Sequence, residues 1–163
     1  MITKKICMLG AFAAGKSCLV KQFVSSIFDD RYLSTLGVKI SKKDVSVGDR
    51  PMSLILWDME GKDVYTAVNI SYLRGAMGFF IVADGTRRET LEIALDLRRQ
   101  ALEAVGEMPH YLLVNKADLA TEWELGRDDI EAVQKTGLRV FVTSAKTGQS
   151  VEEAFISLAS DML

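Results

Sequence analysis

The chain is poor in the residues that mark several protein classes. Among its 163 residues there are only two cysteines, Cys7 and Cys18, and one histidine. Two cysteines inside apolar runs fit neither a zinc-ligand spacing nor a disulfide framework, so the sequence predicts a cytoplasmic protein with reduced thiols. No apolar run approaches the ~20 residues that a membrane-spanning helix needs. Disulfide-rich and membrane-spanning classes therefore find no support.

The chain also lacks a large excess of either positive or negative charge. The 20 Lys and Arg residues nearly balance 22 Asp and Glu residues, for a net charge of −2. Such a surface offers no broad attraction to polyanions, so we expect no nucleic-acid partner. Position 2 is Ile2 rather than glycine, and the last four residues contain no cysteine. We therefore expect no lipid anchor in this chain.

Apolar runs of strand length alternate with segments of helical periodicity. Six runs predict strands, at residues 4–10, 38–47, 52–58, 78–84, 110–116 and 139–145. The second and third runs flank the turn sequence GDRP and form a predicted hairpin. The alternation predicts a single α/β domain whose mostly parallel sheet has one antiparallel edge strand. Ligands of such sheets bind at the carboxyl ends of the strands.

The stretch GAFAAGKS follows the first predicted strand and opens a helix. It matches the phosphate-loop pattern, in which glycines let backbone N–H groups point inward at phosphate oxygens. Lys16 would reach the β- and γ-phosphates, and Ser17 would offer its hydroxyl to Mg²⁺. A glycine turn with a chance lysine is the alternative. The predicted phosphate-binding residues are Ala13, Ala14, Gly15, Lys16, Ser17 and Cys18.

The stretch NKAD follows the fifth predicted strand. The Asp118 carboxylate can accept hydrogen bonds from the N1–H and the amino group of guanine, whereas adenine would leave it without those partners. Asn115 would bridge loops or meet the base edge, and the Lys116 stem would lie over the purine. Taken alone, NKAD also fits a polar helix-capping turn.

Two weaker motifs complete the set. In TSAK, after the last strand, the Ala145 N–H would meet the guanine carbonyl oxygen, with Ser144 and Lys146 beside it. In WDMEG, Asp58 would organise Mg²⁺ through water, and the Gly61 N–H would sense the γ-phosphate. Each motif alone also fits an ordinary turn.

Together these motifs resemble the Ras-like small GTPases. GAFAAGKS, Thr35, DMEG, NKAD and TSAK come in the order and spacing of that family, over nearly the whole chain. The resemblance implies a three-layer P-loop GTPase fold, or G domain, with a six-stranded sheet and about five helices. It also implies one domain over residues 1–163.

The resemblance further implies a molecular switch that binds GTP or GDP with Mg²⁺ and hydrolyses GTP. Phe28 and Tyr32 match the family's aromatic edge against the base and its aromatic lid over the phosphates. Thr35 matches the threonine that binds Mg²⁺ and the γ-phosphate. Effector and regulatory proteins would contact residues 30–42 and 62–75.

Two residues depart from the family pattern. Phe12 stands where a glycine is common, and Lys62 stands where a glutamine is common. Glutamine both donates to and accepts from the attacking water, whereas charged lysine can only donate. With Lys16, Thr35 and Gly61 as the remaining catalytic residues, we expect slow hydrolysis. Two alternatives would restore faster hydrolysis. Lys62 would neutralise the transition-state charge directly, or Arg31 would act as an arginine finger from within the chain.

Three functional hypotheses follow. The first is a slowly hydrolysing switch, and the second is a GTP-bound module that serves as an interaction platform without cycling. A P-loop kinase or ATPase is disfavoured, because NKAD and TSAK read guanine.

Some single residues have a structural interpretation. We interpret Cys18 as a small buried hydrophobe rather than a redox site, and His110 as structural. Trp57 and four apolar residues near it in sequence form either an effector surface or part of the core, and the sequence does not assign each of them. These four residues are Tyr65, Val68, Ile70 and Leu73.

Overall fold

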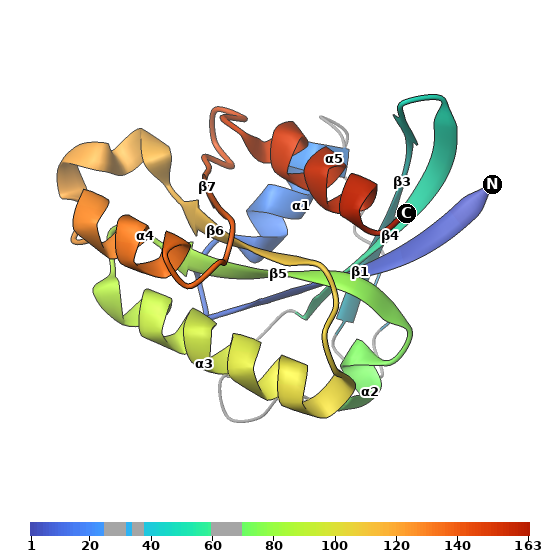
Figure 1. Ribbon diagram of the computed structural model, residues 1–163. Helices are drawn as coiled ribbons and strands as arrows, with labels where there is room; N and C mark the ends of the chain where they lie inside the picture. The colour runs from blue at the N-terminus through green and yellow to red at the C-terminus, as the bar shows by residue number, and fades with distance from the viewer. Residues whose placement is uncertain (25–31, 34–37, 60–69) are drawn as a thin grey trace.

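The computed structural model describes residues 1–24, 32–33, 38–59 and 70–163. In these ranges one sheet has the strand order β2-β3-β4-β1-β5-β6-β7 (Figure 1). The strands are β1 (Ile2–Gly10), β2 (Tyr32–Leu33), β3 (Val38–Val47), β4 (Arg50–Met59), β5 (Ala76–Asp84), β6 (His110–Asn115) and β7 (Val140–Val142).

Helices cover both faces of the sheet. Helices α1 and α5 pack on one face, and α2, α3 and α4 pack on the other, which gives three layers (Figure 1). The helices are α1 (Lys16–Val24), α2 (Ile70–Leu73), α3 (Arg88–Val105), α4 (Arg127–Gln134) and α5 (Val151–Asp161), with a 3-10 helix η1 (Ala117–Glu122). No helix within the described ranges has the length and hydrophobicity of a membrane span.

Strand β5 shows how the core is built. Phe80 and Val82 belong to the cluster beneath α1 and α5, whereas Phe79, Ile81 and Ala83 belong to the cluster beneath α3. All five side chains are fully buried. Because successive side chains of a strand point to opposite faces, one continuous apolar run supplies both cores.

The predicted architecture is confirmed. All six expected strands are present, β3 alone runs against the others, and β3 and β4 form the expected hairpin. The two-residue strand β2 is an addition, since it pairs with β3 only through Tyr32 and Leu33. A pairing this short has no hydrophobic alternation that a sequence pattern could reveal.

The parallel strands end together at one edge of the sheet. Gly10 closes β1, Asp84 closes β5 and Asn115 closes β6, with Asp84 and Asn115 paired in register. The loops that follow these residues lie next to one another although they are far apart in sequence (Figure 1). This edge is where an α/β sheet binds its ligand.

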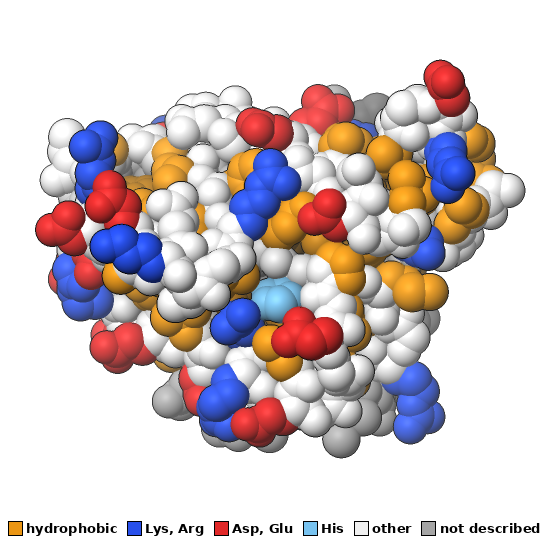
Figure 2. Space-filling view, viewed as in Figure 1, with side chains coloured by type: hydrophobic (Ala, Val, Ile, Leu, Met, Phe, Trp, Pro, Cys, Tyr) orange, Lys and Arg blue, Asp and Glu red, His pale blue; other side chains and the backbone are white. Residues whose placement is uncertain are grey.

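The single histidine begins β6 and makes only structural contacts. The His110 ring stacks on Phe79 at 4.7 Å, its Nε2 accepts a hydrogen bond from Arg98 Nε at 2.8 Å, and its Nδ1 lies 2.7 Å from the Met108 carbonyl oxygen. Figure 2 shows the imidazole at the surface with charged side chains around it. Burial lowers the pKa of His110, as does Arg98, while Glu107 and the Met108 carbonyl oppose them.

Protonation of His110 should therefore destabilise the fold. A histidine whose pKa is lower in the folded state than its usual 6.5 contributes stability above that value and loses it as the pH falls below it. We expect the free energy of unfolding to drop between pH 7 and pH 5 by more in the wild type than in His110→Gln, measured by urea denaturation. Parallel pH profiles for the two proteins would contradict this assignment.

Candidate functional site

The segment from Gly10 to Ser17 forms a tight loop between β1 and α1. A Cβ atom at Gly15 would lie 2.2 Å from the Asn115 Nδ2 atom, and the backbone there has a φ of +103°. Only glycine satisfies both conditions without strain. Ala13 also has a positive φ, of 61°, which is uncommon for a residue with a side chain. The second glycine of the motif is thus required by contact and by conformation.

Lys16 opens α1, yet its side chain turns back over the loop. It is 7% exposed, and its Nζ donates to the carbonyl oxygens of Gly10 at 3.0 Å and Ala11 at 3.2 Å. Burial lowers the pKa of Lys16, and the nearby Asp58 carboxylate opposes that shift. The loop therefore holds a cation inside a curl of backbone, which suits it to an anionic ligand.

Ser17 and Asp58 come together from two different elements. The register of β4 against β1 pairs Asp58 with Met8, and Ser17 Oγ donates a hydrogen bond to Asp58 Oδ2. Asp58 is only 1% exposed. A hydroxyl and a carboxylate are the oxygen donors that Mg²⁺ prefers, so this pair fits the predicted metal. The described residues contain no cluster of three His, Cys, Asp or Glu side chains.

Asn115 is the central residue of the site. Its Nδ2 donates to the Ala14 carbonyl oxygen at 3.1 Å, and its Oδ1 accepts from Thr143 Oγ1 and from the Ala145 N–H, both at 3.2 Å. The side chain is buried, and all three partners lie in other segments. Of the two roles considered for Asn115, the contacts correspond to the bridge between loops.

Asp118 lies in η1, directly after β6. Ser144 Oγ donates to Asp118 Oδ1 at 2.7 Å and accepts from the Thr147 N–H at 3.1 Å. The Asp118 side chain is exposed, as is Lys146 on the neighbouring loop. The carboxylate is therefore oriented by the TSAK loop and is accessible to a ligand.

A buried carboxylate that we did not identify from the sequence lies beside these loops. Asp84 is fully buried at the end of β5, and its Oδ2 lies 2.9 Å from Lys116 Nζ. Lys116 has a left-handed backbone, with φ 76°, and its carbonyl accepts from Trp123 Nε1 at 2.8 Å. The sequence feature that could have indicated Asp84 is an acidic residue at the end of an apolar strand. An acidic side chain at such a buried position needs partners.

Most of the predicted site residues lie in the segment between β1 and α1, at the start of α1, near the end of β4, at the end of β6 and in η1, and after β7. They are Ala13, Ala14, Gly15, Lys16, Ser17, Asp58, Asn115, Lys116, Asp118, Ser144, Ala145 and Lys146. Tyr32 lies in β2, and only its backbone is described. Eight residues named from the sequence or its motifs lie outside the described residues, namely Phe28, Arg31, Thr35, Glu60, Gly61, Lys62, Tyr65 and Val68.

The interpretation of Cys18 as a buried residue is wrong. Cys18 is exposed, because the buried face of α1 is formed by Leu19, Val20 and Phe23. Phe12 is likewise exposed, at 64%.

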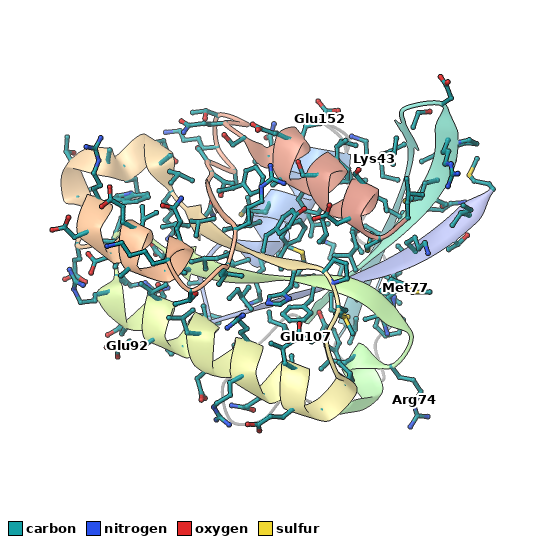
Figure 3. The ribbon with its side chains drawn as sticks, in the orientation of Figure 1. Lys43, Arg74, Met77, Glu92, Glu107 and Glu152 are labelled. Atoms are coloured by element: carbon teal, nitrogen blue, oxygen red, sulfur yellow. The ribbon has the colours of Figure 1, made fainter. Side chains whose placement is uncertain are left out.

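Trp57, Tyr72 and Lys5 form a second polar and aromatic cluster, near the end of α2. Lys5 Nζ lies 3.5 Å from the centroid of the Trp57 ring and donates to the carbonyl oxygens of Tyr72 and Arg74, both at 2.7 Å. The Trp57 and Tyr72 rings meet edge to face at 6.2 Å. Leu73 is buried in the core, whereas Arg74 points away from the sheet (Figure 3).

Comparison with known proteins gives one family. The profile of the Ras family matches residues 5–163. The Ras-related protein Rab-13 of Canis lupus familiaris is 32% identical over 161 residues, which are 98% of this chain and 79% of that protein. The Rab-13 proteins of Bos taurus and Rattus norvegicus are 31% and 32% identical over the same shares. By these matches, and by a fold in agreement with them, the chain belongs to the Ras family of small GTPases.

Proposed function

We propose that this chain is a molecular switch that binds GTP and GDP with Mg²⁺ and hydrolyses GTP slowly. The proposal rests on the hydrogen bonds of the Asn115 side chain, which join the phosphate loop at Ala14 to the base loop at Ala145. Membership of the Ras family supports it, as do relatives named Ras-related protein Rab-13. The switch is a single G domain over residues 1–163 in the cytoplasm.

The phosphate tail binds in the curl of the loop. Backbone N–H groups from Ala13 to Cys18 face the phosphate oxygens, and the N-terminal end of α1 adds a partial positive charge. Lys16 exchanges its contacts with the Gly10 and Ala11 carbonyls for the β- and γ-phosphates. Because the ammonium is already buried, little further desolvation accompanies that exchange.

Ser17, Thr35 and Asp58 would hold Mg²⁺. The Ser17 hydroxyl and, by resemblance to the family, the Thr35 hydroxyl would bind it, and Asp58 would act through water. Bound Mg²⁺ would neutralise charge on the phosphate oxygens. Asp58 also accepts the Ser17 hydroxyl proton in a hydrogen bond, which keeps the Ser17 oxygen in place for the metal.

The base is selected by Asp118. Its carboxylate accepts from the guanine N1–H and amino group, while Ser144 fixes the orientation of the carboxylate. The Lys116 stem would lie over the purine, and the segment of Ala145 and Lys146 would meet the carbonyl edge of the base. By resemblance to the family, Phe28 would supply an aromatic edge against the base. Because two charge-assisted hydrogen bonds depend on the pattern of donors on the base, adenine is rejected.

Exchanging the Asp118 carboxylate for an amide should change base preference rather than abolish binding. Xanthine has a carbonyl where guanine has an amino group, and the NH₂ of Asp118→Asn can donate to it. We expect GDP affinity to fall by ~10²-fold and the affinity for xanthosine diphosphate to rise, measured by calorimetry. Asp128→Asn on α4, an exposed acid outside the site, is the control. Equal loss of both nucleotides would contradict the assigned role.

Hydrolysis is slow because two positions lack the usual groups. By resemblance to the family, Thr35 and Gly61 would contact the γ-phosphate, but charged Lys62 cannot accept a hydrogen bond from the attacking water. The Phe12 ring is exposed and bulky, so it would hinder entry of the arginine of an activating partner. Loss of one preorganised contact commonly costs ~10²–10³ in rate.

Restoring the family residues should speed hydrolysis. We expect Lys62→Gln combined with Phe12→Gly to raise the single-turnover rate by ~10²-fold over the wild type. Lys62→Ala separates a missing acceptor from an inhibitory charge, since it removes the charge without supplying an acceptor. A wild-type rate equal to that of the double variant would reject slow hydrolysis as a property of this site.

The same two residues favour a second function, a GTP-bound interaction platform that does not cycle. Effector and regulatory proteins would contact residues 30–42 and 62–75 in either case. The nucleotide released by denaturing the purified protein separates the two functions. GDP identifies a cycling switch, whereas GTP alone identifies the platform.

A further inference from the structure

We propose that Asp84 and Arg87 are positioning residues of the nucleotide site, and that they fix the phosphate loop and the base loop relative to each other. The inference rests on the proposed function, because its effect is measured on bound nucleotide. It concerns two side chains that lie next to the predicted motifs and belong to none of them.

Asp84 is placed to connect the two loops. Its strand β5 lies between β1, which ends in the phosphate loop, and β6, which ends in the base loop. Asp84 Oδ2 lies 2.9 Å from Lys116 Nζ and 3.1 Å from Arg87 Nε. Its Oδ1 accepts from the Thr86 N–H at 2.9 Å and from Thr86 Oγ1 at 2.7 Å.

These donors keep Asp84 ionised although it is fully buried. Burial by itself would raise the pKa of Asp84, but hydrogen bonds from Lys116, Thr86 and Arg87 outweigh it and hold the pKa below the usual range. A buried carboxylate with two cations needs all its partners, so movement of either cation exposes an unpaired charge. Asp84 therefore resists displacement of Lys116 and of Arg87 alike.

Arg87 extends this connection to the phosphate loop. While its Nε pairs with Asp84, its Nη2 donates to the Phe12 carbonyl oxygen at 2.9 Å. In a trans peptide the C=O and the following N–H point in opposite directions, and the described residues contain no cis peptide. A Phe12 carbonyl held toward Arg87 thus directs the Ala13 N–H away from Arg87. Ala13 is one of the predicted phosphate-binding residues, so Arg87 presets one of its donors.

Both loops contain a strained residue that such contacts can hold in place. Ala13, next to Phe12, has a φ of 61°, and Lys116 has a φ of 76°. Residues with a side chain adopt this conformation at a cost unless their surroundings enforce it. Asp84 acts on Lys116 directly and on the Phe12–Ala13 peptide through Arg87, so one buried carboxylate supports both.

The next residue along the chain provides a matched control. Arg88 is also an ion-paired arginine at the start of α3, but it faces Asp129 and Glu124 instead of the phosphate loop. Its Nη1 lies 2.6 Å from Asp129 Oδ1. Removing Arg88 deletes a more exposed arginine–carboxylate salt bridge without touching Phe12.

The test is GDP dissociation in the presence of Mg²⁺, followed with a fluorescent GDP analogue chased by excess GDP. We expect ~10-fold faster dissociation for Arg87→Ala, because a charge-assisted hydrogen bond on the loop is lost, and for Arg87→Lys, because one ammonium cannot contact Asp84 and Phe12 together. Arg88→Ala should stay within about twofold of the wild type. GDP and inosine diphosphate should be affected equally by Arg87→Ala, since Asp118 is unchanged.

The outcomes separate the inference from the proposed function. Wild-type protein that captures no GDP overturns both. Wild-type protein that binds GDP, with Arg87→Ala dissociating at the wild-type rate or Arg88→Ala accelerating as much as Arg87→Ala, overturns only the inference. Full rescue by Arg87→Lys also overturns it, because charge alone would then suffice. Thermal unfolding of the ligand-free variants shows that each is folded, since the Arg87 side chain is 37% exposed and outside the core.

Discussion

The hydrogen bonds of one buried amide, Asn115, hold the candidate site together. Its side chain meets the Ala14 carbonyl on one loop and the Thr143 hydroxyl and Ala145 N–H on another. An amide this deeply buried loses ~1–3 kcal/mol for each partner that it fails to make, so the two loops cannot separate independently. The close approach of Gly15 to the Asn115 Nδ2 atom follows from the same constraint. A phosphate tail and a base would thereby meet one prearranged surface.

The sheet makes this constraint possible. Parallel strands β1, β5 and β6 are buried on both faces, so their ends are fixed by the core and not by the loops. Buried polar residues at the ends of the strands connect the loops to these fixed positions. Asp84 at the end of β5 and Asp58 near the end of β4 each pair with a neighbouring segment, through Lys116 and Ser17 respectively. Charged groups are buried here only where a partner is supplied.

The strands and the phosphate loop were predictable because the sequence patterns that indicate them are local. Strand length, alternation with helices and the glycine spacing of residues 10–17 are written in consecutive residues, and they predicted six strands and the phosphate loop. The roles of Asp84 and Arg87 were not predictable, because they depend on contacts between residues up to 75 positions apart, as for Arg87 and Phe12. Cys18 was misassigned because the buried face of α1 is formed by Leu19, Val20 and Phe23 and does not include it. Sequence likewise did not decide whether Leu73 belongs to the core or to an effector surface, and the structure buries it in the core.

The measurement that tests the account most directly is a calorimetric titration of nucleotide-free protein with GDP and with ADP, each with Mg²⁺. Preorganised loops and a carboxylate matched to the guanine edge predict that GDP binds tightly and that ADP binds at least ~10⁴-fold more weakly. Omission of Mg²⁺ should weaken the binding of GDP. Equal affinity for the two nucleotides, or no heat with either, would contradict guanine recognition by this edge of the sheet.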